Sequence, residues 1–228
     1  MLLEIKNLSK QFKKGQVQAV RDASFALPAG KTLGIIGASG SGKSTLLKLT
    51  LRLLPCDSGE IYFDQKRIDR LPERELKDFR RRTQMIFQDP YQSLDPRMKI
   101  SGILAEPFLI AGEKRKSFIT EKIKNLLSSV NLSEKFLLRY PHELSGGECQ
   151  RVAIARAVSL EPALLLCDEA VSSLDVVTKI QILNLLLSLQ KERGISLLFV
   201  SHDERAVRHM SDEVRVMKEG ILSEPRFS

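Results

Sequence analysis

Residues 37–45 form a glycine-rich run that could wrap around a phosphate. Its glycines let consecutive backbone N–H groups turn inward, and a helix that begins directly after the run adds positive potential. The amine of Lys43 can reach the β- and γ-phosphates of a nucleotide, and the hydroxyl of Ser44 can ligate Mg²⁺. The pattern therefore predicts binding of a nucleoside triphosphate. The predicted contacts are Gly37, Ala38, Ser39, Gly40, Ser41, Gly42, Lys43, Ser44 and Thr45.

Two acids, Asp168 and Glu169, follow the apolar run at residues 163–167. The end of a strand beside the phosphate loop is where a carboxylate associated with Mg²⁺ belongs, and Asp168 fits that role. Glu169 is placed to polarise a water molecule for in-line attack on the γ-phosphate. Such acids can also simply end a strand in solvent, but the phosphate loop favours the catalytic interpretation.

A second anion-binding pattern lies at residues 144–148, which read Leu-Ser-Gly-Gly-Glu. A serine hydroxyl and glycine N–H groups at the start of a helix can hold a phosphate. Here the sequence resembles the ATP-binding cassette (ABC) family, whose signature is LSGGQ. The resemblance implies that two cassettes pack head to tail, so that Ser145 contacts the γ-phosphate of ATP bound to the other subunit. The signature residues are Leu144, Ser145, Gly146, Gly147 and Glu148.

Other positions match the family one by one. Gln88 looks like the glutamine that senses Mg²⁺ and the attacking water, and His202 looks like the switch histidine that contacts the γ-phosphate. Asp175 resembles the D-loop aspartate at the dimer interface. Phe12 sits where the family usually has a tyrosine that stacks on adenine, and a phenyl ring keeps the π-face. The resemblance thus implies that Glu169, His202 and Gln88 are catalytic and that Ser44, Gln88 and Asp168 hold the metal.

The resemblance is closest to the peptide/nickel importers, because residues 87–98, 140–147 and 168–172 are similar to their motifs. Glu148 replaces the usual glutamine, and Ser173 replaces the usual D-loop alanine. The chain stops soon after Gly220, whereas many oligopeptide-type subunits carry an extension with a cysteine cluster. We therefore expect a nickel, metal-chelate or small-peptide system.

The resemblance implies an ATP-hydrolysing subunit at the cytoplasmic face of the inner membrane. Its expected partners are a second ABC subunit, more often a paralogue than an identical copy, and two membrane permeases. An extracytoplasmic binding protein takes part indirectly, and no nucleic acid is expected. The alternative is a soluble ABC ATPase of a nucleic-acid-linked machine, which usually carries two cassettes or a long coiled-coil insertion. A P-loop kinase or GTPase would not need residues 144–147 or His202.

Hydrophobic periodicity predicts the elements that must position these residues. Apolar strands separated by helices imply an α/β fold with a mostly parallel sheet, flanked by early antiparallel strands. The expected strands lie at residues 3–8, 20–27, 32–36, 59–63, 83–87, 163–167, 195–200 and 214–217. The expected helices lie at residues 43–54, 100–110, 116–130, 133–138, 148–159 and 176–193. The resemblance implies one ABC ATPase domain over residues 1–228, a P-loop NTPase with a RecA-like core at 1–88 and 161–228 and a helical subdomain at 89–160.

Composition excludes other classes of protein. The net charge of +8 could indicate nucleic acid or anionic lipid, but the basic runs at 67–82 and 114–124 carry interleaved acids, which is typical of solvated surfaces. Three cysteines without CxxC spacing argue against a disulfide framework or a zinc site and fit a reducing cytosol. No stretch approaches the ~18 apolar residues of a membrane span, and the N-terminus does not resemble a signal peptide.

Overall fold

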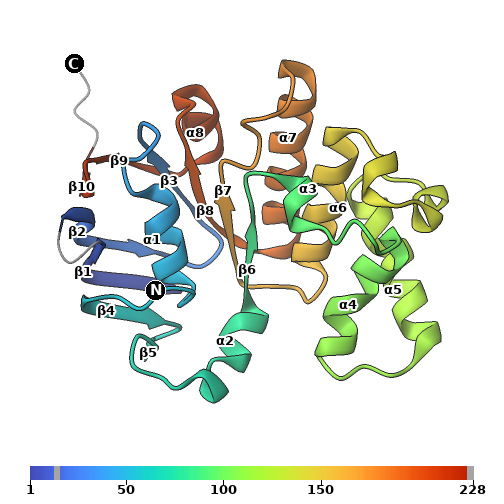
Figure 1. Ribbon diagram of the computed structural model, residues 1–228, viewed down its shortest axis with the longest axis horizontal. Helices are drawn as coiled ribbons and strands as arrows, with labels where there is room; N and C mark the ends of the chain where they lie inside the picture. The colour runs from blue at the N-terminus through green and yellow to red at the C-terminus, as the bar shows by residue number, and fades with distance from the viewer. Residues whose placement is uncertain (13–15, 225–228) are drawn as a thin grey trace.

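The computed structural model describes residues 1–12 and 16–224, and its strands form one mixed sheet (Figure 1). The sheet has the order β5-β4-β1-β2-β10-β9-β3-β8-β7-β6. Its antiparallel flank consists of β1, β2, β4 and β5, and β10 joins this flank to the parallel part. The strands are β1 Leu3–Phe12, β2 Val17–Leu27, β3 Thr32–Ile36, β4 Ser58–Phe63, β5 Lys66–Arg67, β6 Thr83–Ile86, β7 Leu164–Asp168, β8 Ser196–Ser201, β9 Glu213–Lys218 and β10 Ile221–Ser223.

Five parallel strands, β6, β7, β8, β3 and β9, carry the predicted site at one edge of the sheet. Every residue of β7 and β8 is buried, as expected for strands that are covered on both faces. Their register places Asp168 opposite Val200 and Ile36 opposite Ser201. The loops that follow β3, β7 and β8 therefore leave the sheet side by side.

Helices cover both faces of this sheet, and α1 lies on the face that also packs against the antiparallel flank (Figure 1). The α-helices are α1 Lys43–Thr50, α2 Lys77–Arg82, α3 Pro90–Ser93, α4 Ile100–Ile110, α5 Lys116–Ser129, α6 Gly146–Val158, α7 Val176–Arg193 and α8 Glu204–Met210. Short 3₁₀ turns lie at η1 Glu73–Glu75, η2 Glu134–Leu138 and η3 Pro141–Glu143. Within the described residues, no helix is both long enough and apolar enough to cross a membrane.

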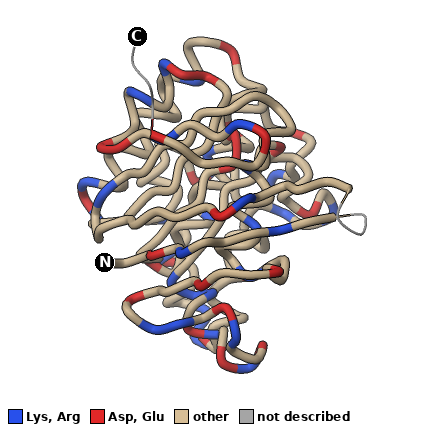
Figure 2. The backbone as a smooth tube through the Cα atoms, turned by 90° about the vertical axis from the view of Figure 1, so that its left-hand side faces the viewer, with Lys and Arg blue, Asp and Glu red and all other residues tan. Residues whose placement is uncertain are grey.

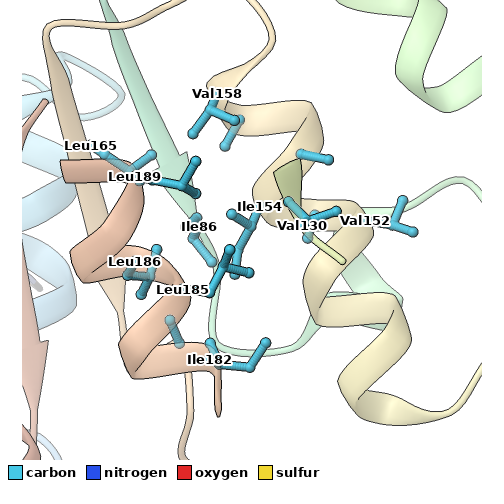
Figure 3. Close-up of a cluster of buried hydrophobic side chains, with 14 of the residues drawn as sticks. Ile86, Val130, Val152, Ile154, Val158, Leu165, Ile182, Leu185, Leu186 and Leu189 are labelled. Atoms are coloured by element: carbon cyan, nitrogen blue, oxygen red, sulfur yellow. The ribbon is translucent and has the colours of Figure 1, made fainter. Parts of the chain in front are cut away.

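Alternation along the central strands divides the apolar side chains into two clusters. Leu164 and Leu166 of β7 join the cluster of α1 and the antiparallel flank. Leu165 and Cys167 point to the other face and join the helices there. Figure 3 shows this second cluster, in which α6 and α7 pack together over Leu165 and Ile86. The helical segment at 89–160 shares this cluster with the sheet, and its separation as a subdomain stays a prediction.

The structure departs from the predicted elements mainly at short or capped segments. The first helix ends at Thr50 instead of residue 54, and Arg52 just beyond it adopts a left-handed conformation with φ of 56°. The stretch at 133–138 is a 3₁₀ turn rather than an α-helix. Five elements were not predicted, because all are too short to show a reliable hydrophobic period. They are β5, α2, α3, α8 and β10.

Candidate nucleotide-binding site

The loop at residues 37–45 connects β3 to the start of α1, as the sequence predicts. Gly42 has φ of +108°, and a Cβ atom built there would lie 2.1 Å from the carbonyl oxygen of Ala19. Any larger residue would therefore strain the backbone and clash with β2. The loop is also tied to the far end of the chain, because the N–H of Gly220 donates to the Ser41 carbonyl at 2.9 Å.

Lys43 folds back over this loop, and its side chain is only 4% exposed. Its Nζ donates to the carbonyl oxygens of Gly37 at 2.7 Å and Ala38 at 2.9 Å. The same Nζ lies 3.4 Å from Oε1 of Glu169. The loop thus holds a buried cation at its centre, which is the position required to bind the phosphates of a nucleotide.

Asp168 and Ser44 form the second part of the site. Asp168 ends β7, and its Oδ1 accepts a hydrogen bond from Ser44 Oγ at 2.9 Å. Burial raises the pKa of Asp168, while the Ser44 hydrogen bond lowers it and the neighbouring charge of Glu169 raises it further. A hydroxyl and a carboxylate are hard oxygen donors, so their chemistry fits Mg²⁺.

Glu169 lies where the other candidate side chains meet. Its backbone has φ of 47°, which is uncommon for a residue other than glycine and turns the chain sharply after β7. Oε2 lies 3.2 Å from Nδ1 of His202 and accepts a hydrogen bond from Nε2 of Gln88 at 3.4 Å. Because Lys43 approaches Oε1, three residues predicted from separate motifs contact this one carboxylate.

A hollow of about 550 Å³ opens over the loop and is lined by most of these residues. Phe12 is 36% exposed and lines this hollow, so its ring is available to stack on a base. The wall supplied by β2 was not predicted, because alternation along a strand does not reveal which other segment that strand lies beside. The lining residues that it missed are Gln16, Val17, Gln18, Ala19, Arg21, Glu219 and Gly220.

The signature residues lie outside this hollow. Ser145 caps α6, and its Oγ accepts from the N–H of Glu148 at 3.3 Å. The Glu148 carboxylate accepts from both the N–H and the hydroxyl of Ser145, at 2.8 and 2.9 Å. Gly147 packs so closely against α7 that a Cβ atom would lie 2.5 Å from Cγ2 of Thr178. Within one chain, none of the signature residues lines the described hollow over Lys43.

The signature also has neighbours within the same chain. Gly146 lines a second hollow together with Gln88 and Asp168. Tyr91, which the sequence analysis assigned no role, donates its hydroxyl to the carbonyl of Leu144 at 2.9 Å. Asp175 caps α7 by accepting from the N–H groups that follow it, so its side chain fixes the start of that helix.

The parallel sheet, the phosphate loop and the acids after β7 define a P-loop ATPase. A profile described as "ABC transporter" matches residues 20–172, and the chain belongs to this family. The structure resembles a dimeric, post-hydrolysis ATP-binding cassette, MJ0796, bound to ADP and Pi, with a TM-score of 0.87 and 29% identity over 99% of this chain and 100% of that one. The predicted fold class, an α/β P-loop NTPase of ABC type, is therefore confirmed, and so is the prediction of an ATP-binding, ATP-hydrolysing cassette.

Curated relatives narrow the class further. The chain is 45% identical to the oligopeptide transport ATP-binding protein OppF of Haemophilus influenzae, over 98% of this chain and 71% of that protein. It is 43% identical to OppF of Bacillus subtilis, over 98% of this chain and 74% of that protein. It is 46% identical to the glutathione import ATP-binding protein GsiA of Pectobacterium atrosepticum, over 92% of this chain and 34% of that protein. The resemblance to the peptide/nickel importers is confirmed.

Proposed function

We propose that this chain is the ATP-hydrolysing subunit of an importer and that Glu169 is its general base. The observation that carries this proposal is the meeting of Lys43, Gln88 and His202 at the Glu169 carboxylate, within 3.2–3.4 Å. A carboxylate beside a phosphate loop can accept a proton from the water that attacks the γ-phosphate. His202 and Gln88 then hold that water and the phosphate in line with Glu169.

The contacts of Lys43 connect the phosphate loop to Glu169. The amine of Lys43 is shared between two loop carbonyls and Glu169. The phosphates of ATP would compete for this amine because they carry more charge than one carboxylate. In this proposal the phosphates of ATP take over the Lys43 amine, and Glu169 is left to accept a proton from the attacking water.

A magnesium ion fits the oxygen atoms of this site. Ser44, Asp168 and Gln88 would hold it, and the bound ion would neutralise charge on the phosphates. Asp168 is 6% exposed and lies beside Glu169, so its charge is costly until a cation joins it. This cost supports a role in binding metal rather than in fold stability.

The position of the signature supports an assembly of two cassettes. Ser145 does not line the Lys43 hollow, so a complete site requires a signature from a second subunit. We propose a paralogous partner, with Ser145 and the glycines after it contacting the γ-phosphate of that partner's ATP. Asp175, at the start of α7, would lie at the interface between the two cassettes.

The two membrane permeases would dock beside β6, the strand at one edge of the sheet. A hollow of about 200 Å³ there is lined by Phe87 and Leu53, which are 41% and 52% exposed. Its other walls include Leu94 and Arg156, so the segment after Gln88 and helix α6 both border it. A permease helix in this hollow would bear directly on the segment that carries Gln88. We therefore place the chain at the cytoplasmic face of the inner membrane.

The surface charge argues against nucleic acid as a partner. On the face shown in Figure 2, Lys and Arg are interleaved with Asp and Glu instead of forming a basic stripe. Within the run at 67–82, Arg80 pairs with Glu73 at 2.5 Å and Arg82 pairs with Asp64 at 3.0 Å. The neighbouring acids offset the positive charge that attracts a phosphate backbone.

For the cargo, we propose small peptides, because the relatives are named for oligopeptide and glutathione transport. Nickel and metal chelates remain the other part of the sequence prediction. An uptake assay separates them: cells whose only copy carries Glu169→Gln should lose import of a labelled dipeptide and keep nickel uptake. Loss of nickel uptake alone would contradict the peptide assignment.

The ATPase assignment is tested with purified protein. The isolated chain should bind ATP yet hydrolyse it slowly, and adding the paralogous cassette should raise turnover. Lys43→Ala should abolish binding and turnover, while Lys31→Ala, which changes an exposed lysine of the β2–β3 turn, serves as the matched control. High turnover that is independent of protein concentration in the isolated chain would refute the two-cassette site.

A further inference from the structure

Lys179 and Asp203 form an ion pair between α7 and the loop that carries His202. Nζ of Lys179 lies 2.7 Å from Oδ2 of Asp203, and the two side chains are 24% and 28% exposed. The pair is thus partly screened from water, unlike most of the ion pairs on this surface. It joins the fourth residue of α7, four positions after Asp175, to the residue that directly follows His202.

Asp203 is anchored on its other side as well. Its N–H donates to Ser201 Oγ at 3.0 Å, and its Oδ1 accepts from the N–H of Ala206 at 3.2 Å. One carboxylate oxygen therefore caps α8 while the other receives Lys179. His202 lies between Ser201 and Asp203 in the chain, so the orientation of its ring depends on where Asp203 is held.

The position of Lys179 is unfavourable for the helix alone. The first turns of an α-helix carry a positive dipole end, which disfavours a cation, and α7 has no acidic residue in its first turn. The N–H of Lys179 donates to the carbonyl of Asp175 at 2.8 Å, so the lysine belongs to the same turn as the D-loop aspartate. The Asp203 carboxylate offsets this cost, which indicates that the lysine serves the contact rather than the helix.

We propose that Lys179 is a positioning residue for ATP hydrolysis, which ties the His202 loop to the first turn of α7 and thereby keeps His202 at Glu169. This inference rests on the proposed role of His202 in the site. His202 Nδ1 lies 3.2 Å from Oε2 of Glu169, a contact that a small shift of the loop would break. Because Asp175 begins the same helical turn, movement at the D-loop would reach His202 through this pair.

The test uses four variants in the assembled two-cassette ATPase. Lys179→Met removes the charge and keeps the length of the side chain. Asp203→Asn removes the pair but keeps the cap of α8, since asparagine caps helices as well as aspartate does. Lys179→Arg keeps the charge. The matched control is Lys31→Met, because Lys31 Nζ pairs with Asp212 at 2.8 Å and that aspartate also accepts a backbone N–H, from Thr32.

We expect Lys179→Met and Asp203→Asn each to lower kcat about tenfold, below the ~100-fold that a misplacement of 1 Å can cost. KM for ATP should stay within twofold, because the phosphate loop is untouched. The double variant should be no worse than either single one, since both remove the same contact. Lys179→Arg should restore most of kcat, and Lys31→Met should leave it unchanged.

A second readout does not depend on turnover. The ring signals of the three histidines can be followed by NMR and assigned through His202→Asn. In Lys179→Met the His202 signals should shift while those of His142 stay in place, and Lys31→Met should shift neither. An unshifted His202, or equal losses of kcat in Lys179→Met and Lys31→Met, would overturn the inference. A different result would be that the two wild-type cassettes together fail to hydrolyse ATP while the His202 signals still shift in Lys179→Met. The proposed function would then fail, and the positioning contact would stand.

Discussion

Replacing Glu169 by glutamine removes one negative charge from the centre of the site and keeps the size of the side chain. The Glu169 side chain is only 12% exposed and meets Lys43, His202 and Gln88. Glutamine can keep its oxygen toward Lys43 and turn its NH₂ group toward His202 and Gln88, where the neutral imidazole nitrogen and a rotated Gln88 amide can accept. What it cannot do is accept a proton from water at neutral pH, so the substitution separates chemistry from binding.

The expected size follows from these contacts. A positioned general base contributes about 10²–10⁴ in rate, so hydrolysis should fall by that factor, or about 2.7–5.4 kcal/mol in the activation free energy. ATP affinity should stay within a few-fold, because Lys43 keeps its bonds to the Gly37 and Ala38 carbonyls and gains freedom to meet the phosphates. Bound ATP should then persist between the two cassettes and prolong the life of the dimer.

The assay combines single-turnover phosphate release, direct ATP binding and gel filtration with ATP and Mg²⁺, all with the proposed paralogous cassette present. Glu213→Gln is the matched control, since that carboxylate pairs with Arg215 at 2.7 Å on the surface of β9. It should match the wild type in every measurement. Wild-type hydrolysis by Glu169→Gln would refute the assignment of the base and direct attention to Asp168 or His202.

Three further substitutions test other parts of the structure. Gly42→Ala should abolish ATP binding and lower the melting temperature, because its Cβ would lie 2.1 Å from the Ala19 carbonyl; a protein with unchanged affinity would contradict the loop geometry. Burial raises the pKa of Asp168, so its charge at neutral pH destabilises the fold, and Asp168→Asn should raise the melting temperature measured without nucleotide. About 1 kcal/mol corresponds to roughly 2–4 °C for a chain of this size. The same substitution should remove Mg²⁺-dependent hydrolysis. Hydrogen bonds from Lys10 and the Gln11 N–H lower the pKa of Asp57. The ionised carboxylate therefore stabilises the fold above its ordinary pKa, and this stabilisation is lost as pH falls through the lowered pKa. Asp57→Asn should make the free energy of unfolding, measured in urea, differ less between pH 7 and pH 3 than in the wild type.

The parallel half of the sheet could be predicted from sequence because its strands are continuous apolar runs. β7 and β8 are buried on both faces, so their hydrophobic residues appear without interruption. Helix α8 could not be found in this way. It has seven residues, and its capping residue, Asp203, is used at the same time by Lys179. Short capped helices depend on such single contacts more than on periodicity.

The candidate site was predictable as a set of positions but not as a set of contacts. Motif spacing brings Lys43, Gln88 and His202 to the same edge of the sheet, which the parallel registers explain. It does not predict that all three contact Glu169, because those distances depend on backbone turns after the strands. The wall supplied by β2 and by Gly220 was missed for the same reason, since it forms only when the two ends of the chain meet.

Asp168 and Glu169 show why neighbouring carboxylates can take different roles. Asp168 still belongs to β7 and points toward Ser44, into a buried position where its charge is costly. At Glu169 the backbone turns to φ of 47°, and the next carboxylate is carried toward Lys43 and His202 instead. An extended residue at 169 would place its side chain on the opposite face of the strand, away from both. The left-handed turn therefore sends the two carboxylates in different directions, as their proposed roles at the metal and at the water require, and its energetic cost of about 1–3 kcal/mol is the kind that functional sites retain.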